Sequence, residues 1–211
     1  MSTKSHKSSY LSEINLKETN ALLVSLSHLA NDKNIPIIQP EGLAFLKQII
    51  LLKKARHILE IGTAIGYSSI AMASLDKHIK IDTIERNQTL YDEAKKHIAS
   101  SPYKNQISLH FGDALELEFN TDKEYDLIFI DAAKAQNKVL FEKYEKYLHD
   151  EGVIIVDNLL FHDLVNGRPG SRNLRQLVRK IDDFNRYIVN RSDYSTTIYP
   201  IGDGMSLSIK R

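Results

Sequence analysis

Short apolar runs alternate with amphipathic helical stretches through the middle of the chain, and this alternation constrains the fold more than any other feature. The apolar runs are HILEI (57–61), IKIDTI (79–84), QISLHF (106–111), YDLIFI (125–130) and GVIIV (152–156). Parallel strands need long crossovers, and helices usually provide them. The pattern therefore predicts an α/β fold, in which a doubly wound parallel sheet carries helices on both faces.

Two further patterns flank this central region. Residues 10–29 have apolar side chains at helical spacing, and residues 43–52 form a second amphipathic stretch after the prolines of IPIIQPEG. We expect residues 1–53 to form a helical lid. After a long helix over 172–189, the glycines of IGDG separate STTIYP from MSLSIKR, which predicts a C-terminal antiparallel hairpin. The length supports a single domain over residues 1–211.

Composition narrows the classes of partner and chemistry. The formal net charge of +1 provides no overall attraction to nucleic acid or membranes, so a polyanionic partner would need a local basic patch. The absence of cysteine excludes disulfides, thiolate metal sites and thiol nucleophiles, and it fits a reducing compartment such as the cytoplasm. Because no apolar run has the length of a signal peptide or membrane span, we expect a cytoplasmic protein without membrane contact.

The segment LEIGTAIGYSS places two glycines, Gly62 and Gly66, directly after the first strand, where open α/β sheets bind ligands. A dinucleotide-binding loop needs glycine at its third and sixth positions as well, but Ala64 and Tyr67 occupy them. The loop is therefore poorly suited to a pyrophosphate. It is also compatible with an ordinary tight turn between strand and helix.

Acidic residues follow this loop at informative positions. Glu60 ends the first strand, and Glu85 ends the second, about twenty residues beyond the loop, where an acid can hold ribose hydroxyls. Asp113, in the GDA segment after the third strand, is a candidate acceptor for an adenine amino group. A nucleoside with an amino-acid tail fits better than a dinucleotide, which points to S-adenosylmethionine. The plainer alternative is that these acids are solvated.

Oxygen-bearing side chains end the fourth and fifth strands. Asp131 follows YDLIFI, and Asp157 and Asn158 follow GVIIV. If these strands are neighbours, the three side chains meet at the carboxyl edge of the sheet, beside the glycine loop. Two carboxylates and an amide oxygen suit Mg²⁺ better than zinc or copper. The alternative is that they are only polar caps on strand ends.

Lys134 lies one short turn beyond Asp131. Beside a bound cation the proton affinity of its amine would fall, so that it could remove a proton from a substrate hydroxyl. A solvated surface lysine explains its position equally well.

Six motifs together resemble a known family. LEIGTAIGYSSIAMA, IDTIE, GDA, FIDAAK, GVIIVDNLLF and PIGDG resemble, in order and spacing, the divalent-metal-dependent O-methyltransferases of the catechol and caffeoyl-CoA type. The resemblance extends from about residue 35 to the carboxyl terminus. Within the family, IPIIQPEG and the short chain look like the bacterial tRNA 5-hydroxyuridine methyltransferases. Asn137 stands where plant members usually carry tyrosine, which argues against a plant-like phenolic acceptor.

The resemblance implies a homodimer and the Rossmann-like seven-stranded sheet of the S-adenosylmethionine methyltransferases. It implies that Asp131, Asp157 and Asn158 hold Mg²⁺, and that Asp131 and Lys134 act in catalysis. With the two loop residues Glu60 and Gly62 included, the expected donor site consists of Ile38, Glu60, Gly62, Ser68, Glu85, Asp113, Ala114 and Asp131.

The reaction implied is methylation of 5-hydroxyuridine at the wobble position of tRNA to 5-methoxyuridine, with the anticodon region as the partner. The same chemistry on a small catechol-like or acyl-CoA substrate is an alternative, because a catechol also offers two adjacent oxygens. An alternative of another class is a non-catalytic module that binds S-adenosylmethionine or a metal.

Arginines mark one face of the expected helix over 172–189. Arg172, Arg175, Arg179 and Arg186 share a face by their spacing, and Arg168 precedes them; the inward positions would be Leu174, Leu177, Val178, Ile181 and Phe184. Such a stripe is usually the solvated side of an amphipathic helix, with Asp182 and Asp183 as local partners. The alternative is that it contacts the phosphates of an anticodon stem-loop.

Overall fold

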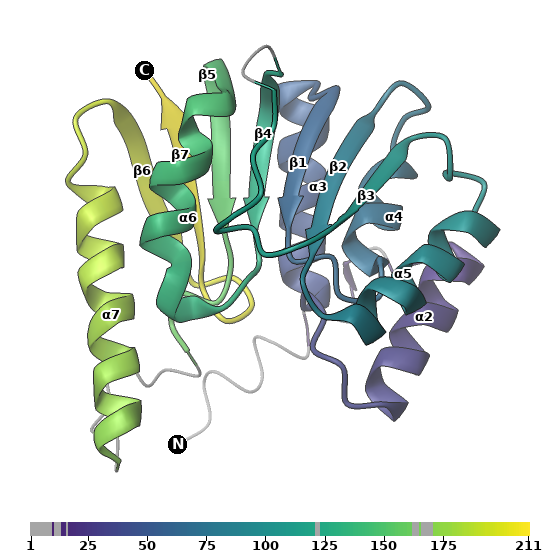
Figure 1. Cartoon of the computed structure of the whole chain (residues 1–211), viewed down its shortest axis with the longest axis horizontal. Helices are drawn as coiled ribbons and strands as arrows, with labels where there is room; N and C mark the ends of the chain where they lie inside the picture. Colours follow the sequence, from purple (N-terminus) through teal and green to yellow (C-terminus); the bar gives the residue numbers. More distant parts are fainter. Residues whose placement is uncertain (1–9, 11–13, 16, 121–122, 162–164, 166–170) are drawn as a thin grey trace.

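Seven strands form one mixed sheet at the centre of the protein (Figure 1). This computed structural model describes residues 10, 14–15, 17–120, 123–161, 165 and 171–211. The strands are β1 (His57–Ile61), β2 (Lys80–Glu85), β3 (Ile107–Phe111), β4 (Tyr125–Ile130), β5 (Leu148–Val156), β6 (Tyr194–Tyr199) and β7 (Met205–Lys210).

Their order in the sheet is β3-β2-β1-β4-β5-β7-β6. Strands β1 to β5 are parallel, whereas β7 runs antiparallel to both β5 and β6. The predicted doubly wound parallel sheet with a C-terminal antiparallel hairpin is therefore confirmed. Because the order reverses between β1 and β4, the carboxyl ends of these two strands flank the switch point at which such sheets bind ligands.

Helices cover both faces of the sheet (Figure 1). The longer ones are α2 (Ala21–Asp32), α3 (Pro40–Lys53), α4 (Tyr67–Ala73), α5 (Gln88–Ser100), α6 (Asn137–Tyr144) and α7 (Arg172–Val189). Two single-turn helices, η1 (Lys134–Gln136) and η2 (Glu145–Tyr147), lie on either side of α6. No helix of the described residues is long and apolar enough to cross a membrane.

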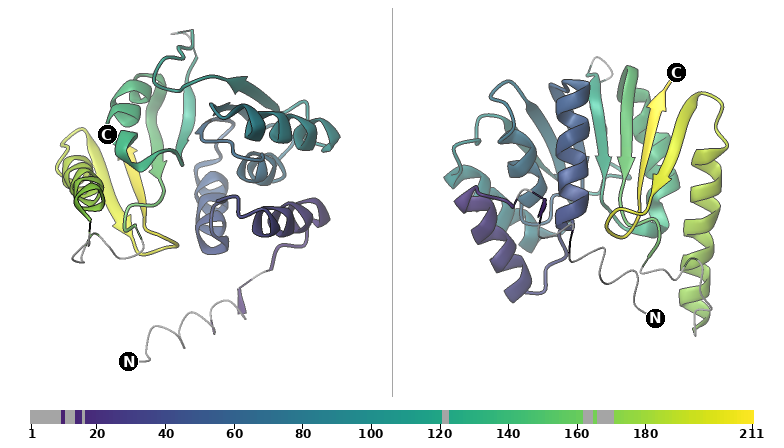
Figure 2. Two further views of the ribbon diagram at one scale, coloured as in Figure 1. Left: turned by 60° about the horizontal axis from the view of Figure 1, so that its bottom comes forward. Right: turned by 180° about the vertical axis from the view of Figure 1, so that it is seen from behind.

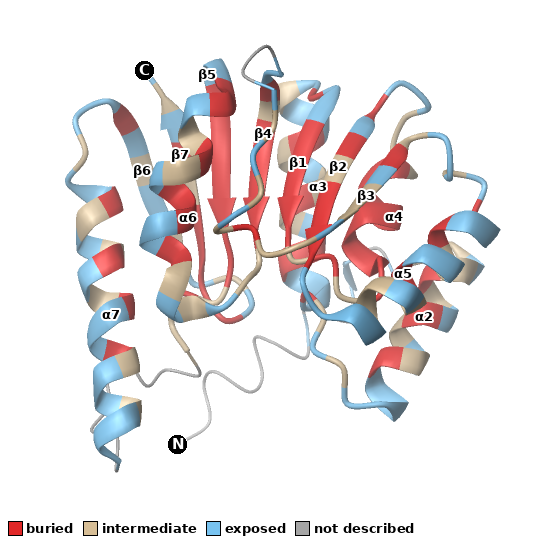
Figure 3. Ribbon diagram, in the orientation of Figure 1, coloured by how far each residue is buried: buried red, intermediate tan, exposed pale blue. Residues whose placement is uncertain are grey.

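Alternating side chains along the strands build two hydrophobic cores. On β1, Ile58 packs with helices α2 to α5 on one face, whereas Leu59 and Ile61 pack with α6 and α7 on the other. The central strands are buried along most of their length, and the helices expose only their outer sides (Figure 3). Seen from behind in Figure 2, α3 lies over the middle of the sheet, and no described helix lies in front of the yellow strands β6 and β7.

Two element boundaries differ from the sequence-based expectation. Residues 17–20 are not helical, and α2 begins at Ala21, because the Asn20 side chain accepts a hydrogen bond from the Leu22 amide and caps the helix there. The helical stretch KVLFEKYEKYL (138–148), between the apolar runs YDLIFI and GVIIV, is also predicted from its spacing, but α6 ends at Tyr144. Strand β5 starts at Leu148, four residues before its apolar run. The role of residues 1–53 as a lid stays a prediction; within them α2 and α3 contribute to the core.

Candidate active site

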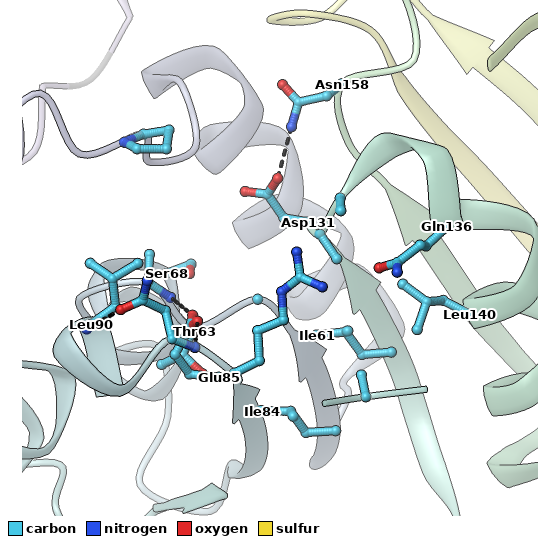
Figure 4. Close-up of a pocket in the computed structure, with 18 of the residues that line it drawn as sticks. Ile61, Thr63, Ser68, Ile84, Glu85, Leu90, Asp131, Gln136, Leu140 and Asn158 are labelled. Atoms are coloured by element: carbon cyan, nitrogen blue, oxygen red, sulfur yellow. Dashed lines mark hydrogen bonds between the residues drawn. The ribbon is translucent and has the colours of Figure 1, made fainter. Parts of the chain in front are cut away.

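A cavity of about 450 Å³ opens at the carboxyl ends of β1, β2 and β4, a volume typical of small-molecule sites. Seven of the residues expected to bind the donor line it: Ile38, Gly62, Ser68, Glu85, Asp113, Ala114 and Asp131. Asp131, Lys134 and Asn158 line its other end. Figure 4 shows that Ser68 and Glu85 lie on one side of this space and that Asp131 and Asn158 lie together on the other.

The turn after β1 has room only for glycine at its first position. Gly62 has a φ of 107°, and a Cβ added there would lie 2.0 Å from the Asp131 carbonyl oxygen. The amides of Gly62 and Thr63 both donate to the Ile84 carbonyl, at 3.1 and 3.2 Å. Gly66, with a φ of 87°, then caps α4. The loop is thus held close to β2 and β4, and it forms the floor of the cavity.

Glu85 is fixed at the end of β2 by two backbone amides. Its Oε2 accepts a hydrogen bond from the Ala64 amide and its Oε1 accepts one from the Asn87 amide, each at 2.8 Å. Each carboxylate oxygen keeps a further lone pair. The side chain therefore fits the predicted role of accepting hydrogen bonds from ribose hydroxyls at the cavity wall.

Glu60 does not lie where a donor contact would require, and its predicted place in the donor site is corrected. Because Leu59 and Ile61 pack toward α6, the intervening Glu60 points to the opposite face, beneath α4. It is fully buried, and its Oε2 accepts hydrogen bonds from the hydroxyls of Ser69 and Thr83. Its Oε1 has no hydrogen-bond partner, and burial raises the pKa of this carboxyl.

The structure brings together the three predicted metal ligands, Asp131, Asp157 and Asn158. Asn158 Nδ2 donates to Asp131 Oδ1 at 2.7 Å (Figure 4), and the Asn158 amide donates to Asp157 Oδ1, also at 2.7 Å. The strand ladders extend to both aspartates, since the Asp131 amide donates to Ile61 and the Asp157 amide to Ile130. The sequence prediction that these side chains meet at one edge of the sheet is confirmed.

The protonation of the two aspartates is strongly affected by their surroundings. Burial, and then repulsion from Glu60, raises the pKa of Asp131 to about 6. Burial, and then repulsion from Asp131, raises the pKa of Asp157 to about 7. Lys134 opposes both shifts only in part. Two carboxylates in this setting favour a neutralising proton or cation.

The side chains of this group have the chemistry of a cation site, but one of them is not turned for it. Within the part of the chain that the structure describes, no three histidine, cysteine, aspartate or glutamate side chains are placed to hold a metal ion. The predicted set has only two such side chains, and the third member, Asn158, points its amide nitrogen at Asp131. Rotation of that amide by half a turn would present Oδ1 instead. The donor set, two carboxylates and one amide, is the chemistry of a hard divalent ion.

Lys134 begins the single-turn helix η1 and lines the cavity beside Asp131. Its Nζ lies 4.8 Å from the centre of the Phe161 ring, a cation–π contact. Arg86 and Gln136 also line the cavity, although they were not predicted as site residues. Their places in the sequence could have indicated this, because Arg86 directly follows Glu85 and Gln136 lies two residues after Lys134.

The arginine stripe forms as expected on α7. Arg172, Arg175, Arg179 and Arg186 are exposed, whereas Val178, Ile181 and Phe184 are buried and Leu174 and Leu177 are half-buried. Arg186 pairs with Asp182 at 3.0 Å, and Arg179 lies 3.9 Å from Asp183. These local partners agree with the solvated-helix interpretation but leave the guanidinium groups largely accessible. Arg168 lies outside the described residues.

Comparison with known proteins assigns the family. Residues 5–211 match the O-methyltransferase family profile. A catechol O-methyltransferase of Niastella koreensis is 29% identical over 95% of this chain and 94% of its own length.

Solved structures agree with that match. A provisionally named caffeoyl-CoA O-methyltransferase from Staphylococcus aureus has a TM-score of 0.88 at 39% identity, with 99% of each chain covered. An O-methyltransferase from Bacillus cereus in complex with SAH has a TM-score of 0.80 at 26% identity, with 96% of each chain covered. These likenesses set aside the non-catalytic module. The cavity lies at the switch point of the sheet, where such folds bind ligands. This chain belongs to the O-methyltransferase family and is an S-adenosylmethionine-dependent enzyme.

Proposed function

We propose that the enzyme is Mg²⁺-dependent and methylates 5-hydroxyuridine at the wobble position of tRNA, giving 5-methoxyuridine. The observation that carries this proposal is the exposed arginine face of α7. That helix begins at the edge of the sheet where β4 and β5 end, so its first arginines lie on the same side of the molecule as the cavity (Figure 1). A protein with a net charge of +1 needs such a local patch to bind RNA.

The acceptor would bind at the end of the cavity lined by Asp131 and Asn158. These two residues, together with Asp157 next to Asn158, would hold the cation. Mg²⁺, when bound, lowers the pKa of a hydroxyl that it contacts. The raised pKa values of both aspartates support this assignment, because a cation relieves the repulsion that helps to raise them. A uracil with a 5-hydroxyl group and its neighbouring 4-carbonyl offers two adjacent oxygens to such a site.

Lys134 is the proposed base. Lys134 lines the cavity, its Nζ lies over the Phe161 ring, and its charge favours the ionised form of Asp131, so it lies at the proposed acceptor end. As the neutral amine it would take the proton of the acceptor hydroxyl while the oxygen attacks the donor methyl group; the methyl–sulfur bond breaks and S-adenosylhomocysteine leaves. The remaining contribution is alignment: holding donor and acceptor in line typically lowers a barrier by about 7–11 kcal/mol.

A small catechol-like or acyl-CoA acceptor is the second candidate, and the names of the relatives favour it. They include a catechol O-methyltransferase and a provisionally named caffeoyl-CoA O-methyltransferase. The paired carboxylates suit a catechol as well as a hydroxyuracil, so the cation site does not distinguish the two. The difference lies outside the cavity, in whether the arginine face contributes to substrate binding.

The test compares methyl transfer to tRNA from cells that lack the gene with transfer to a catechol and an acyl-CoA. We expect 5-methoxyuridine in the tRNA by nucleoside mass spectrometry. Replacing Arg172, Arg175 and Arg179 with glutamine should raise KM for tRNA, and each lost phosphate contact should flatten log affinity against log salt by about 0.7–0.9.

A matched control removes the same charge from the opposite edge of the sheet. Lys95, Lys96 and Lys104, on or after α5, would be replaced with glutamine in one variant. This control should keep the KM for tRNA of the wild type. Efficient transfer to the catechol with none to tRNA, or equal tRNA kinetics in both triple variants, contradicts the tRNA proposal.

We also propose that the enzyme acts in the cytoplasm as a homodimer. Support comes from apolar side chains on the face that α3 shares with the hairpin. The rings of Phe45 and Tyr199 are in tilted contact with centroids 5.5 Å apart, and Leu52 and Ile209 are exposed. Sedimentation equilibrium of the wild type and a Leu52→Glu variant tests this. A monomeric wild type would refute it.

A further inference from the structure

The loop after β5 has an unusual backbone that must be held in place. Residues 157–161 carry Asp157 and Asn158, and two non-glycine residues in it, Asn158 and Phe161, have positive φ values of 68° and 47°. L-residues adopt this left-handed region only when surrounding contacts determine it. The question is which contacts keep Asn158 directed at Asp131.

The turn between β6 and β7 supplies two of these contacts. The Leu159 amide donates to the Gly204 carbonyl at 2.9 Å, and the Leu160 amide donates to the Asp203 carbonyl at 2.8 Å. Just before the loop, Val156 pairs with Ser206 in the β5–β7 ladder. Backbone pairing therefore brackets Asp157 and Asn158 on both sides, and the turn lies against the loop.

Close approach of the turn to the loop depends on Gly204. Its φ is +90°, and a Cβ there would lie 2.5 Å from Leu160 Cγ and 2.9 Å from the Leu160 amide nitrogen. Gly202, in the same turn, also has a positive φ, of +56°, but its Cβ would meet only the Gln39 side chain at 3.5 Å or more. Both glycines meet a conformational demand, but only Gly204 is in close contact with the loop.

Helix α7 supplies a third contact. Asn185 Nδ2 donates to the Leu159 carbonyl at 3.0 Å, and the Leu159 side chain is fully buried. The same residue of the loop is thus held through its amide by the turn and through its carbonyl by α7. Neither Asn185 nor the residues of the turn line the cavity.

We infer that Gly204 and Asn185 are positioning residues, which hold the loop 157–161 so that Asn158 and Asp157 stay beside Asp131. This inference rests on the proposed use of that group in cation and acceptor binding. Its physical basis is that residues behind a ligand set commonly fix its geometry, and their loss lowers cation affinity or activity. The donor end of the cavity, built on β1 and β2, does not depend on them.

The first experiment compares Gly204→Ala with the control Gly202→Ala. Hydrogen exchange at the Leu159 and Leu160 amides should accelerate in Gly204→Ala only. Calorimetry should show Mn²⁺ affinity lowered by about 10–100-fold, a range typical of lost partners behind a ligand set, with SAH affinity unchanged. The rate of methyl transfer, kcat, should fall to a similar extent.

The second experiment uses Asn185→Asp, which keeps the shape of the side chain but removes the N–H group that donates a hydrogen bond to the Leu159 carbonyl. This experiment can be done even if Gly204→Ala fails to fold. Cation affinity should again fall without loss of SAH binding, and Asn185→Gln should recover part of it. The inference is overturned if amide exchange accelerates while Mn²⁺ affinity stays that of the wild type. It is also overturned if SAH affinity falls equally. A wild type that binds Mn²⁺ but does not methylate tRNA refutes the proposed acceptor and leaves this test intact.

Discussion

Raising the pH of the metal-free enzyme from about 4 to about 8 is expected to lower its free energy of unfolding, because of the carboxyl pair Asp131 and Asp157. Both pKa values lie above the ordinary value of 3.8, at about 6 and about 7. The folded state therefore binds these protons more tightly than the unfolded chain does. The resulting stabilisation is complete below about pH 4, and it is lost as the pH rises through 6 to 7.

The magnitude follows from the size of these shifts. For Asp157, the difference between 3.8 and about 7 corresponds to about 4 kcal/mol, at about 1.4 kcal/mol for each pH unit. For Asp131, the difference between 3.8 and about 6 corresponds to about 3 kcal/mol. Since repulsion from Asp131 is part of the shift of Asp157, the two contributions are not independent, and the total lies between about 4 and about 7 kcal/mol, a large part of a typical domain stability.

The assay is urea-induced unfolding from about pH 4.5 to about pH 8 in the presence of a chelator, for the wild type and for Asp157→Asn. Other titrating groups act in both proteins and cancel in the comparison. Because the range starts above the unfolded pKa of 3.8, the wild type should lose about 3 kcal/mol more than the variant across it. Parallel stability profiles would show that the pair titrates normally, and the electrostatic argument for the site would fail.

Three further outcomes test the two ends of the cavity. Mg²⁺ should raise the melting temperature of the wild type more at pH 8 than at pH 5.5, because at pH 5.5 protons compete with the cation for Asp131 and Asp157. In calorimetric scans, Asp157→Asn should lose this effect. Gly62→Ala should abolish SAH binding, since its Cβ would lie 2.0 Å from the Asp131 carbonyl oxygen. Gly66→Ala should only weaken SAH binding, because the nearest atom to its Cβ, in the Ile98 side chain, would be 3.5 Å away. Equal SAH affinities of the two variants would contradict the placement of the loop. Glu85→Ala should weaken SAH binding by about 1.5–3 kcal/mol in titration calorimetry without changing Mn²⁺ affinity, and unchanged SAH affinity would mean that the ribose lies elsewhere.

The sequence predicted the sheet because its signal is local and repeated. Each apolar run alternates sides, as Ile58 and Leu59 do, and each crossover is long enough for a helix. The start of the first helix was wrong because apolar spacing continues upstream of Asn20, whereas the boundary is set by a single capping hydrogen bond. Spacing alone does not reveal such a cap.

The positions of site residues were predictable where a residue stands at the end of a strand. Asp131, Asp157 and Glu85 all follow apolar runs, and the parallel order brings these ends to one edge. The predicted donor contact of Glu60 was wrong because successive residues of a strand point to opposite faces of the sheet. The apolar neighbours Leu59 and Ile61 indicated that Glu60 points to the other face. The contribution of Gly204 was not predictable, since it depends on β7 lying between β5 and β6.

The insertion of β7 beside β5 also fixes an order of events during synthesis. The glycine loop and Glu85 are in place once β1 and β2 have formed, but the amides of Leu159 and Leu160 gain their backbone partners only when residues 203–204 have emerged. At roughly 5–20 residues per second, the intervening chain takes a few seconds to make. During that interval a nascent chain carries the glycine loop and Glu85 while the loop 157–161 is not yet held by the turn, so these two parts of the cavity wall become fixed at different times.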